Sequence, residues 1–340
     1  MNKEVIIIAE AGVNHNGDIS KAKKLIDIAA ESGADYIKFQ TFKADNIVSK
    51  TAKKANYQIL NSNNSETQYE MLKRLELSEK DHQKLIKYCK QKKIKFFSTA
   101  FDCEGLDYLN KLGFEFFKIP SGEITNYPYL KKLALIGKPV ILSTGMANMI
   151  EIKDAINLLT SQKLTIGDIT VLHCNTEYPT PMTDVNLKAM ISIRENFNVN
   201  IGYSDHTLGF EVSIAAVALG ARVIEKHFTI NRKLQGPDHA SSLEPKELFQ
   251  MVQCIRNVEK SISGNGIKKP SDSEIKNMNS VRKSLHYKEN FYAGHIIQSE
   301  DLISLRPGSG VSPMQIEKYI GKELNQNVKS LTIIKNTQFI

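Results

Sequence analysis

The chain alternates between two patterns of apolar and polar positions from residue 5 onward. Short runs of β-branched and aromatic residues are each followed by a longer stretch in which apolar residues recur three or four positions apart. In residues 20–34, Leu25, Ile28 and Ala29 fall on one helical face, and Ser20 and Ser78 are placed to cap helices. The first pattern is typical of buried strands and the second of amphipathic helices. We therefore predict a regular alternation of strand and helix.

The strand pattern recurs along the chain in the runs VIIIAEAG, YIKFQTF, KFFSTAF, FFKIPSG, PVILSTG, ITVLHCN, NIGYSDH and VIEKHFT. Eight strands alternating with helices over about 250 residues are the signature of a (β/α)8 barrel, the TIM barrel of the α/β class. A doubly wound sheet also alternates, but it usually ends near about six strands and needs a phosphate turn such as GxGxxG. That turn is absent from the sequence, so the barrel is the better prediction.

Composition divides the chain into three parts. We expect residues 1–262 to form the barrel, the Gly/Ser/Lys-rich stretch 263–281 to be a linker, and residues 282–340 to form a small β-rich module. The longest insertion, residues 43–78, follows the second strand. In a barrel this insertion lies at the carboxyl end of the strands, so it is expected to line or cover the active site.

Composition and charge narrow the class of function. Hydrophobic residues make up 41% of the chain, and no apolar run is long enough to span a membrane. The N-terminus has no cleavage site of the signal-peptide type, and the four cysteines form no CxxC pair, so a cytoplasmic protein is expected. The net charge of +8 suits an anionic small substrate or nucleic acid. Most lysines, however, lie in helical stretches, where a solvated helix face is the better interpretation, and no aromatic-basic pattern is present, so nucleic acid is not favoured.

Polar side chains follow the strand runs, at the end of the barrel where active sites gather. They are Glu10, Lys38, Gln40, Ser98, Thr99, Lys118, Ser121, Glu123, Ser143, Thr144, Asn175, Glu177, Tyr178, Ser204, Asp205, His206, Glu225, Lys226 and His227. Residues able to bind charge or move protons thus follow every strand. A barrel that served only as a scaffold would not need them.

Two histidines, His206 and His227, follow successive strands. Adjacent strands lie about 5 Å apart, so the two imidazoles can share one cation, with Asp205 and Glu225 as candidates to orient them. Oxygen ligands would complete the site, which suits Mn²⁺ or Mg²⁺ at least as well as structural zinc. The alternative is that each histidine only forms hydrogen bonds in the barrel mouth. For a pair on adjacent strands we favour the metal.

Two lysines, Lys38 and Lys118, lie inside otherwise apolar strands. A lysine there is costly without an anionic partner, and with the hydroxyls of Thr99, Ser121 and Ser143 the pair suits a phosphate or a phosphorylated carboxylic acid. The alternative is that each lysine stem runs along the strand end and leaves its ammonium group in water. We favour the ligand.

One carboxylate, Glu10, ends the very apolar first strand. A desolvated carboxylate can act as a general base toward water or a hydroxyl, and the alternative is a structural ion pair with Lys38. In the turn that follows, His15 and Asn16 are either ligands or turn residues.

The motifs resemble one enzyme family. IIAEAGVNHNGD, KFQTFKAD, KIPSGEITNYPYL, ILSTGM, LHCNTEYPTP, GYSDHTLG and VIEKHFT…GPDHASSLEP are similar to those of the sialic acid (N-acetylneuraminate or nonulosonate) synthases. The tail, VRKSL…LRPGSGVSPM, resembles the C-terminal antifreeze-like (SAF, β-clip) domain of those enzymes. The likeness covers nearly the whole chain and follows the expected order.

The resemblance implies that phosphoenolpyruvate and water react with the open-chain aldehyde of N-acetylmannosamine to give N-acetylneuraminate and phosphate. The alternative acceptor is 2,4-diacetamido-2,4,6-trideoxymannose, which gives N,N'-diacetyllegionaminic acid, and a 6-phosphate sugar is a third. A metal-dependent aldolase or another phosphoenolpyruvate condensation would not need the SAF-like tail. A carbohydrate-binding protein without catalysis would not need to keep Glu10, His206 and His227.

The resemblance also implies a role for individual residues. The catalytic residues would be Glu10, Glu123 and Asp238; phosphoenolpyruvate would be bound by Lys38, Thr99, Lys118, Ser121, Ser143 and Ser204; the sugar by Gln40, Asn63, Tyr178 and Arg306; and the metal by His206 and His227. The metal would be Mn²⁺, with Mg²⁺ or Co²⁺ as alternatives. Arg306 would reach the sugar from the other subunit of a domain-swapped homodimer.

Overall fold

The structure is a computed structural model that describes residues 4–55, 58–59 and 66–340. The chain forms two compact units, Met1–Ser263 and Gly264–Ile340. The stretch predicted as a linker, 263–281, falls almost wholly in the second unit and contains helix α12 (Asp272–Val281). This helix forms because Ser271 and Glu274 make a reciprocal capping box at its first turn.

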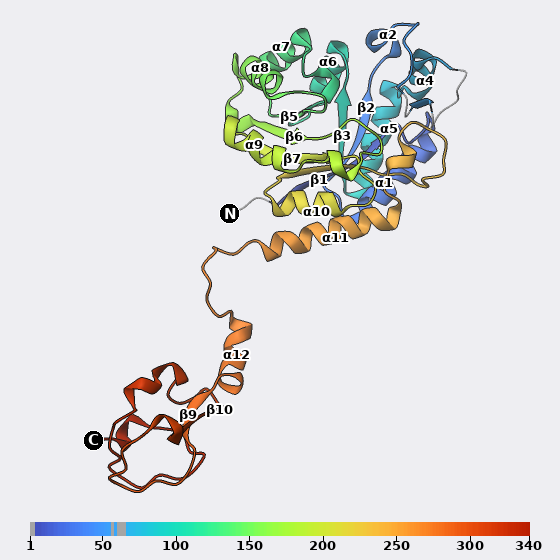
Figure 1. Cartoon of the computed structure of the whole chain (residues 1–340). Helices are drawn as coiled ribbons and strands as arrows, with labels where there is room; N and C mark the ends of the chain where they lie inside the picture. The colour runs from blue at the N-terminus through green and yellow to red at the C-terminus, as the bar shows by residue number, and fades with distance from the viewer. Residues whose placement is uncertain (1–3, 56–57, 60–65) are drawn as a thin grey trace. The chain divides into compact units, whose positions relative to one another are not determined.

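The first unit is the predicted (β/α)8 barrel (Figure 1). Within the described residues its strands are β1 (Ile6–Gly12), β2 (Tyr36–Thr41), β3 (Lys95–Ala100), β4 (Phe117–Ile119), β5 (Val140–Ser143), β6 (Ile169–His173), β7 (Asn200–Asp205) and β8 (Val223–His227). The strands pair in parallel in the order β3-β2-β1-β8-β7-β6-β5-β4. The two ends of this order, β3 and β4, contact each other and complete the ring.

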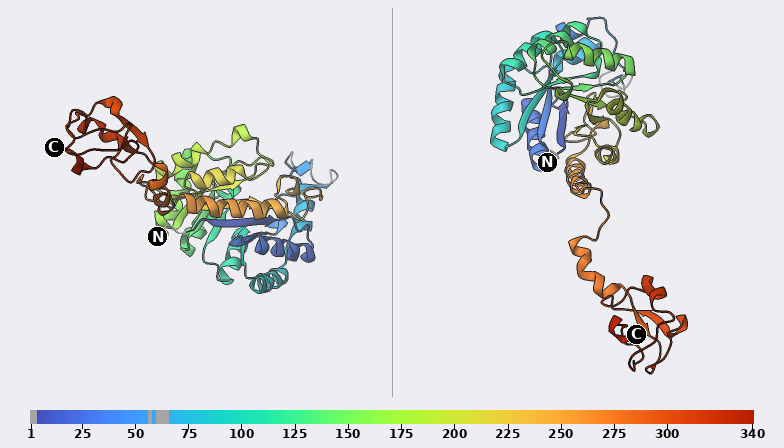
Figure 2. Two further views of the ribbon diagram at one scale, coloured as in Figure 1. Left: turned by 90° about the horizontal axis from the view of Figure 1, so that it is seen from below. Right: turned by 90° about the vertical axis from the view of Figure 1, so that its left-hand side faces the viewer.

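Helices surround the strands of this unit (Figures 1 and 2). They are α1 (Ile19–Ser32), α2 (Ala44–Ile47), α4 (Gln68–Leu75), α5 (Glu79–Lys92), α6 (Cys103–Lys111), α7 (Tyr127–Ile136), α8 (Met149–Thr160), α9 (Lys188–Phe197), α10 (Glu211–Ala218) and α11 (Pro245–Ser261). Ser78 caps α5 as predicted. The prediction for Ser20 was wrong, because the carboxylate of Asp18 accepts hydrogen bonds from the first backbone N–H groups of α1.

The alternation of side chains along the strands explains where the polar residues gather. A cluster of apolar side chains fills the barrel interior on the side of the amino ends of the strands. It consists of Ile8, Tyr36, Phe97, Ile141, Leu172 and Val223. Side chains two positions further along a strand share its face. These are Glu10, Lys38, Thr99, Ser143, Cys174 and Glu225. The two-residue period of the strands therefore places reactive side chains next to this apolar cluster, which we call the apolar floor, at the carboxyl end of the interior.

The insertion after β2 builds one side of the space above this floor. Helices α2 and α4 come from the insertion, and their Ile47, Met71 and Leu75 pack with Val13 and Phe42 in a separate apolar cluster. This agrees with the prediction that residues 43–78 line the site.

The second unit has its own small core. Its strands β9 (Ser284–Tyr287) and β10 (Leu302–Leu305) pair antiparallel. The core residues are Leu285, Tyr287, Ile297, Leu302, Tyr319, Leu324, Val328 and Ile334. Isolated β-bridges join the remaining segments of the unit, so the expected β-rich module is confirmed.

Among the described residues, no helix is long and apolar enough to cross a membrane.

Candidate active site

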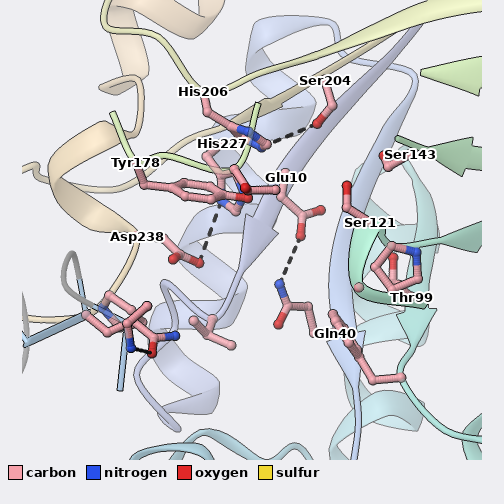
Figure 3. A pocket seen from close by; sticks show the side chains of 18 of the residues that line it. Glu10, Gln40, Thr99, Ser121, Ser143, Tyr178, Ser204, His206, His227 and Asp238 are labelled. Atoms are coloured by element: carbon pink, nitrogen blue, oxygen red, sulfur yellow. Dashed lines mark hydrogen bonds and ion pairs between the residues drawn. The ribbon is translucent and has the colours of Figure 1, made fainter. Parts of the chain in front are cut away.

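A cavity of about 650 Å³ opens at the carboxyl ends of the strands (Figure 3). It brings together the predicted residues Glu10, Lys38, Gln40, Thr99, Lys118, Ser121, Glu123, Ser143, Tyr178, Ser204, His206, His227 and Asp238. Asn63 lies outside the described residues. Arg306 lies in the second unit, where its Nε donates to the backbone oxygen of Val281 at 3.0 Å.

Two lysines and two carboxylates form a charged cluster in the cavity. Lys38 Nζ lies 2.7 Å from Glu225 Oε2 and 3.3 Å from Glu10 Oε2, and Lys118 Nζ lies 3.1 Å from Glu225 Oε1. All four side chains are buried. Sequence reasoning predicted the lysines and Glu10, but it missed Glu225 as the counter-ion of both lysines.

Burial and charge shift the pKa values within this cluster in different directions. Burial raises the pKa of Glu10 to about 8, although the Lys38 ammonium partly offsets this shift. Burial also acts to raise the pKa of Glu225, but its ion pairs with Lys118 and Lys38 outweigh burial and hold that pKa well below its usual range. Burial lowers the pKa of Lys118, against the attraction of Glu225. Glu225 is therefore ionised at neutral pH, and Glu10 is poised to exchange a proton near neutral pH.

Hydroxyl groups line the cavity beside the lysines. Among the described residues, Thr99 Oγ1 and Ser143 Oγ are buried without a hydrogen-bond partner. Ser121 Oγ accepts from the Gly145 backbone N–H at 3.0 Å. A buried hydroxyl that lacks a partner costs free energy, so Thr99 and Ser143 fit a ligand that supplies oxygen acceptors.

The two predicted metal ligands face each other across the adjacent strands β7 and β8. The ring centroids of His206 and His227 are 5.6 Å apart, and the Tyr178 ring lies 4.2 Å from that of His206. His206 Nδ1 lies 2.5 Å from the backbone oxygen of Asn175, which fixes its ring. Within the described residues His227 Nδ1 is buried without a hydrogen-bond partner, and Asp238 Oδ2 lies 3.8 Å from it.

These groups fit a divalent cation. Burial lowers the pKa of His206 to about 4 and that of His227 well below its ordinary value, so both rings are neutral at pH 7 and able to bind metal. Among residues 4–55, 58–59 and 66–340, no cluster of three or more His, Cys, Asp or Glu side chains is arranged to hold a metal. A cation bound by the two imidazoles alone would keep positions for water or substrate oxygens, as catalytic metals do.

The expectation that Asp205 and Glu225 accept hydrogen bonds from the histidine rings was wrong. Asp205 lies on the outer face of β7 and pairs with Lys226 at 3.1 Å, and Glu225 binds the lysines instead. The signal was present in the sequence, because alternation along a strand places Asp205 on the face opposite to Ser204 and His206.

The loop after β8 brings Asp238 to the same point as Glu10 and His227. A Cβ atom on Gly12, whose φ is +49°, would lie 3.1 Å from His227 Cε1, 3.3 Å from Glu10 Oε1 and 3.4 Å from Asp238 Oδ2. Glycine at this position leaves room for the three groups to converge. Burial raises the pKa of Asp238 to about 7, so this carboxyl can also exchange a proton near neutral pH.

Asn14 holds this loop in place, a role that sequence reasoning did not find. Its side-chain amide donates to the backbone oxygen of Phe228 at 2.8 Å and to Ser242 Oγ at 2.9 Å. Ser242 Oγ donates in turn to the backbone oxygen of Asp238 at 2.7 Å. Asn14 is buried, so these bonds link the turn after β1 to the loop that carries Asp238.

Two further predicted residues lie at the cavity edge. Gln40 Nε2 is 3.5 Å from Glu10 Oε1 (Figure 3). Glu123 lies in a short 3-10 helix after β4, accepts from Asn126 Nδ2 at 2.5 Å, and has its pKa raised by burial. His15, left open as a ligand or a turn residue, accepts from the Gly17 backbone N–H at 3.0 Å and is buried in the turn.

The fold and this cavity are typical of a (β/α)8-barrel enzyme that acts on an anionic small molecule. Residues 25–268 match the model of the NeuB family, and residues 282–340 match that of the SAF domain. The chain belongs to the NeuB family. The resemblance seen in the sequence is thereby confirmed, as is the expectation of a synthase-type enzyme with a SAF domain.

Individual relatives are similar over nearly their full length. The chain is 53% identical over 333 residues to N,N'-diacetyllegionaminic acid synthase of Campylobacter jejuni, covering 98% of this chain and 99% of the relative. It is 48% identical over 330 residues to the protein of the same name from Legionella pneumophila, covering 96% and 92%. The crystal structure of a sialic acid synthetase from Leptospira borgpetersenii is 37% identical, with a TM-score of 0.70, covering 82% of this chain and 93% of that one.

Proposed function

We propose that the protein condenses phosphoenolpyruvate with 2,4-diacetamido-2,4,6-trideoxymannose and water to give N,N'-diacetyllegionaminic acid and phosphate. The observation that carries the reaction is the meeting of two buried lysines, a carboxyl poised near neutral pH and two facing histidines in one cavity. Membership of the NeuB family supports this type of condensation. The two relatives named above favour the legionaminic acid alternative over the main expectation, N-acetylmannosamine.

Phosphoenolpyruvate would bind where the positive charge is concentrated. Lys38 and Lys118 would bind its phosphate or carboxylate through charge-assisted hydrogen bonds. The hydroxyls of Thr99, Ser121, Ser143 and Ser204 would donate to the remaining oxygens. Because Glu225 already keeps both lysines in place, little further side-chain ordering would be needed on binding.

His206 and His227 would hold a divalent cation, for which we propose Mn²⁺. When bound, such an ion supplies Lewis-acid polarisation of the aldehyde oxygen. Tyr178 lies against both rings and would help to exclude water from this side of the cavity.

The reaction balances with the groups present. Carbon 3 of phosphoenolpyruvate forms a bond to the aldehyde carbon of the sugar, and positive charge develops at carbon 2. Water adds at carbon 2 while Glu10 takes one of its protons, and this proton passes on to the former aldehyde oxygen, which becomes a hydroxyl group. The tetrahedral intermediate then becomes the ketone as its carbon–oxygen bond to phosphate breaks, and the second proton of the water leaves with the phosphate. Lys38 and Lys118 would stabilise the negative charge on the departing phosphate. We propose Glu123 and Asp238 as further catalytic groups, and Gln40 and Asn63 as sugar-binding groups.

An apolar side of the cavity suits a deoxygenated sugar. Val13, Ile47, Met71, Leu72 and Leu75 line it, from the turn after β1 and from the β2 insertion. The methyl group at carbon 6 of a 6-deoxy sugar, and the methyl groups of its acetamido substituents, can be buried there at a gain of about 0.8 kcal/mol for each methyl-sized group. A hydroxymethyl group at carbon 6 would lose hydrogen bonds to water at the same place.

We also propose that the enzyme is a cytoplasmic homodimer. The apolar side chains of Tyr127, Met146, Ile150 and Met182 are exposed in the first unit, which suits a surface covered by a second subunit. In a domain-swapped dimer, Arg306 of the second unit would reach the acetamido group of the sugar.

The experiment that tests this function is phosphate release by the metal-stripped, full-length protein. Phosphoenolpyruvate and Mn²⁺ are supplied with 2,4-diacetamido-2,4,6-trideoxymannose, N-acetylmannosamine or N-acetylmannosamine 6-phosphate. We expect release that requires both the metal and a sugar, and that is fastest with the trideoxy sugar. Faster release with N-acetylmannosamine would overturn the proposed acceptor, and no release with any sugar would overturn the reaction.

A further inference from the structure

An ion pair lies immediately behind the two histidines. Asp205 and Lys226 are direct partners in the register of β7 and β8, and each precedes one of the histidines in the sequence. Lys226 Nζ lies 3.1 Å from Asp205 Oδ2, and both side chains are completely buried. The side chains point outward, between the strands and the surrounding helices, because the inward faces of these strands carry Ser204 and Glu225.

The remaining polar atoms of the pair are also satisfied. Lys226 Nζ donates to the backbone oxygen of Thr207 at 2.6 Å. Asp205 Oδ1 accepts from the Thr207 backbone N–H at 2.9 Å and from its hydroxyl at 2.8 Å, and Oδ2 accepts from Ser213 on α10 at 2.7 Å. The pair thus fixes the residue after His206, the residue before His227 and the helix behind them.

The stability of the fold does not require an ion pair at this position. Its neighbours on the outer faces of the same strands, Tyr203 and Ile224, are uncharged and belong to the hydrophobic core. A buried ion pair can often be replaced by apolar residues of similar volume without loss of stability, because the desolvation of two charges offsets their attraction. What the ion pair adds over an apolar pair is a fixed direction and length.

We propose that Asp205 and Lys226 are positioning residues that set the separation and orientation of His206 and His227 for metal binding. The inference rests on the proposed metal site. The pair holds the backbone of both strands at the point where each histidine leaves it, and Asn175 holds the His206 ring from the other side. Histidine ligands depend on this kind of support, because small errors in ligand position weaken metal affinity.

The test is Mn²⁺ titration by calorimetry on the full-length, metal-stripped protein and its variants. The main variant is Asp205→Leu/Lys226→Met, which removes both charges while keeping a branched side chain at 205 and an unbranched one at 226. Its matched control is Asp35→Leu/Arg256→Met, which removes the 2.8 Å ion pair between Asp35, the residue before β2, and Arg256 on α11. We expect the Kd for Mn²⁺ to rise at least tenfold in the main variant and to stay within twofold of wild type in the control. Phosphoenolpyruvate affinity should stay within twofold in both.

Asp205→Asn tests the same inference if the double variant fails to fold, because it removes only the charge. We expect a smaller rise in the Kd for Mn²⁺, of severalfold. A Kd within twofold of wild type in either folded Asp205 variant would overturn the positioning role while leaving the metal site standing. Absence of Mn²⁺ binding by the wild-type protein would instead overturn the proposed metal site, and the inference with it.

Discussion

The carboxylate of Glu225 lies 2.7 Å from the ammonium group of Lys38, and its second oxygen lies 3.1 Å from Lys118. One buried acid therefore neutralises part of the charge of two buried lysines before any substrate arrives. Burial lowers the pKa of Lys118, and the attraction that opposes this shift comes first from Glu225. The positive charge offered to phosphoenolpyruvate thus depends on a residue with no direct part in the proposed reaction.

Glu225→Gln should weaken phosphoenolpyruvate binding more at high pH than at low pH. Without the carboxylate, the pKa of Lys118 falls further, so its charge is kept below that pKa and lost as pH rises through it. Loss of one charge-assisted hydrogen bond corresponds to an affinity decrease of about tenfold or more. Calorimetric Kd values at pH 6.5 and 8.5 measure the effect, and we expect the larger variant-to-wild-type ratio at pH 8.5.

The control for this prediction is Glu104→Gln, which removes the exposed ion pair with Lys43 and should leave binding unchanged. Equal ratios at the two pH values for Glu225→Gln would show that the charge of Lys118 does not depend on Glu225.

Glu10→Gln should leave phosphoenolpyruvate binding nearly intact and lower turnover. The amide keeps the shape of the side chain but cannot take a proton from water, and general-base catalysis is worth about 10²- to 10⁴-fold. Because burial raises the pKa of Glu10 to about 8, and the base acts only when ionised, wild-type kcat/KM should rise with pH through that value. The residual activity of the variant should lack this rise.

Rates of phosphate release from pH 6 to 9.5, with binding measured separately, check both parts of the Glu10 prediction. Weakened binding with unchanged turnover would exclude Glu10 as the base and assign it to the substrate site.

The elements of the barrel could be predicted from the sequence because their signals are local. Each strand run has a clear apolar pattern, and each ends in polar residues, so the eight strands and most of the cavity follow from neighbouring positions. Asp205 shows that alternation along a strand also predicts whether a side chain points into the barrel or away from it. Asp205 and Glu225 were expected to bind the histidines because they lie close to them in the sequence. Alternation along the strand, which places Asp205 on the outer face, was given too little weight.

The partners of these residues could not be predicted in the same way. Glu225 is 187 positions from Lys38, and their contact depends on the closure of the barrel. The contact of Asn14 with Ser242 spans 228 positions and depends on the path of the loop after β8. Periodicity shows that a side chain faces the interior, but it does not show which of the other inward side chains it meets.

His82 should make the barrel less stable in mild acid. Burial lowers the pKa values of His15, His82 and His239 to about 4, against 6.5 when unfolded. The unfolded chain therefore binds more protons between pH 6.5 and 4, and stability falls as pH falls through this range. Each group contributes roughly 1.4 kcal/mol per pH unit in the middle of this window.

His82→Phe should make the free energy of unfolding depend less steeply on pH, by the contribution of one histidine. Urea midpoints followed by the helical circular dichroism signal between pH 4.5 and 7 measure the slope. Phe96→Leu, which alters packing beside His82 without removing a titratable group, is the control. If the slopes of His82→Phe and wild type coincide, His82 does not stay neutral in the folded protein.

Leu72→Gln should reduce the preference for the trideoxy sugar. Leu72 lies on the apolar side of the cavity, and a polar amide there would no longer bury a methyl group of the sugar. At about 0.8 kcal/mol per methyl-sized group, kcat/KM for the trideoxy sugar should fall about fourfold relative to N-acetylmannosamine. Competition between the two sugars measures the ratio. An unchanged ratio would place the methyl group elsewhere in the cavity.

Asn14→Leu should weaken use of the sugar while sparing phosphoenolpyruvate. The substitution keeps the branched shape of the side chain but removes the hydrogen bonds to Phe228 and Ser242. Ser242, which donates to the backbone oxygen of Asp238, is then no longer tied to the turn after β1. We expect the KM for the sugar to rise severalfold and the KM for phosphoenolpyruvate to stay within twofold. Stability should fall by about 1–3 kcal/mol, because the oxygen of Phe228 is left without this donor.

Ser32→Ala separates loss of stability from loss of position. It removes a buried hydrogen bond of 2.7 Å to the Ala29 oxygen within α1, far along the chain from Asp238. This variant should lose stability with both KM values unchanged. If Asn14→Leu behaves in the same way, Asn14 supports only the fold. If the sugar KM alone rises, the turn after β1 positions Asp238, and the first and last strands of the barrel cooperate in binding the acceptor.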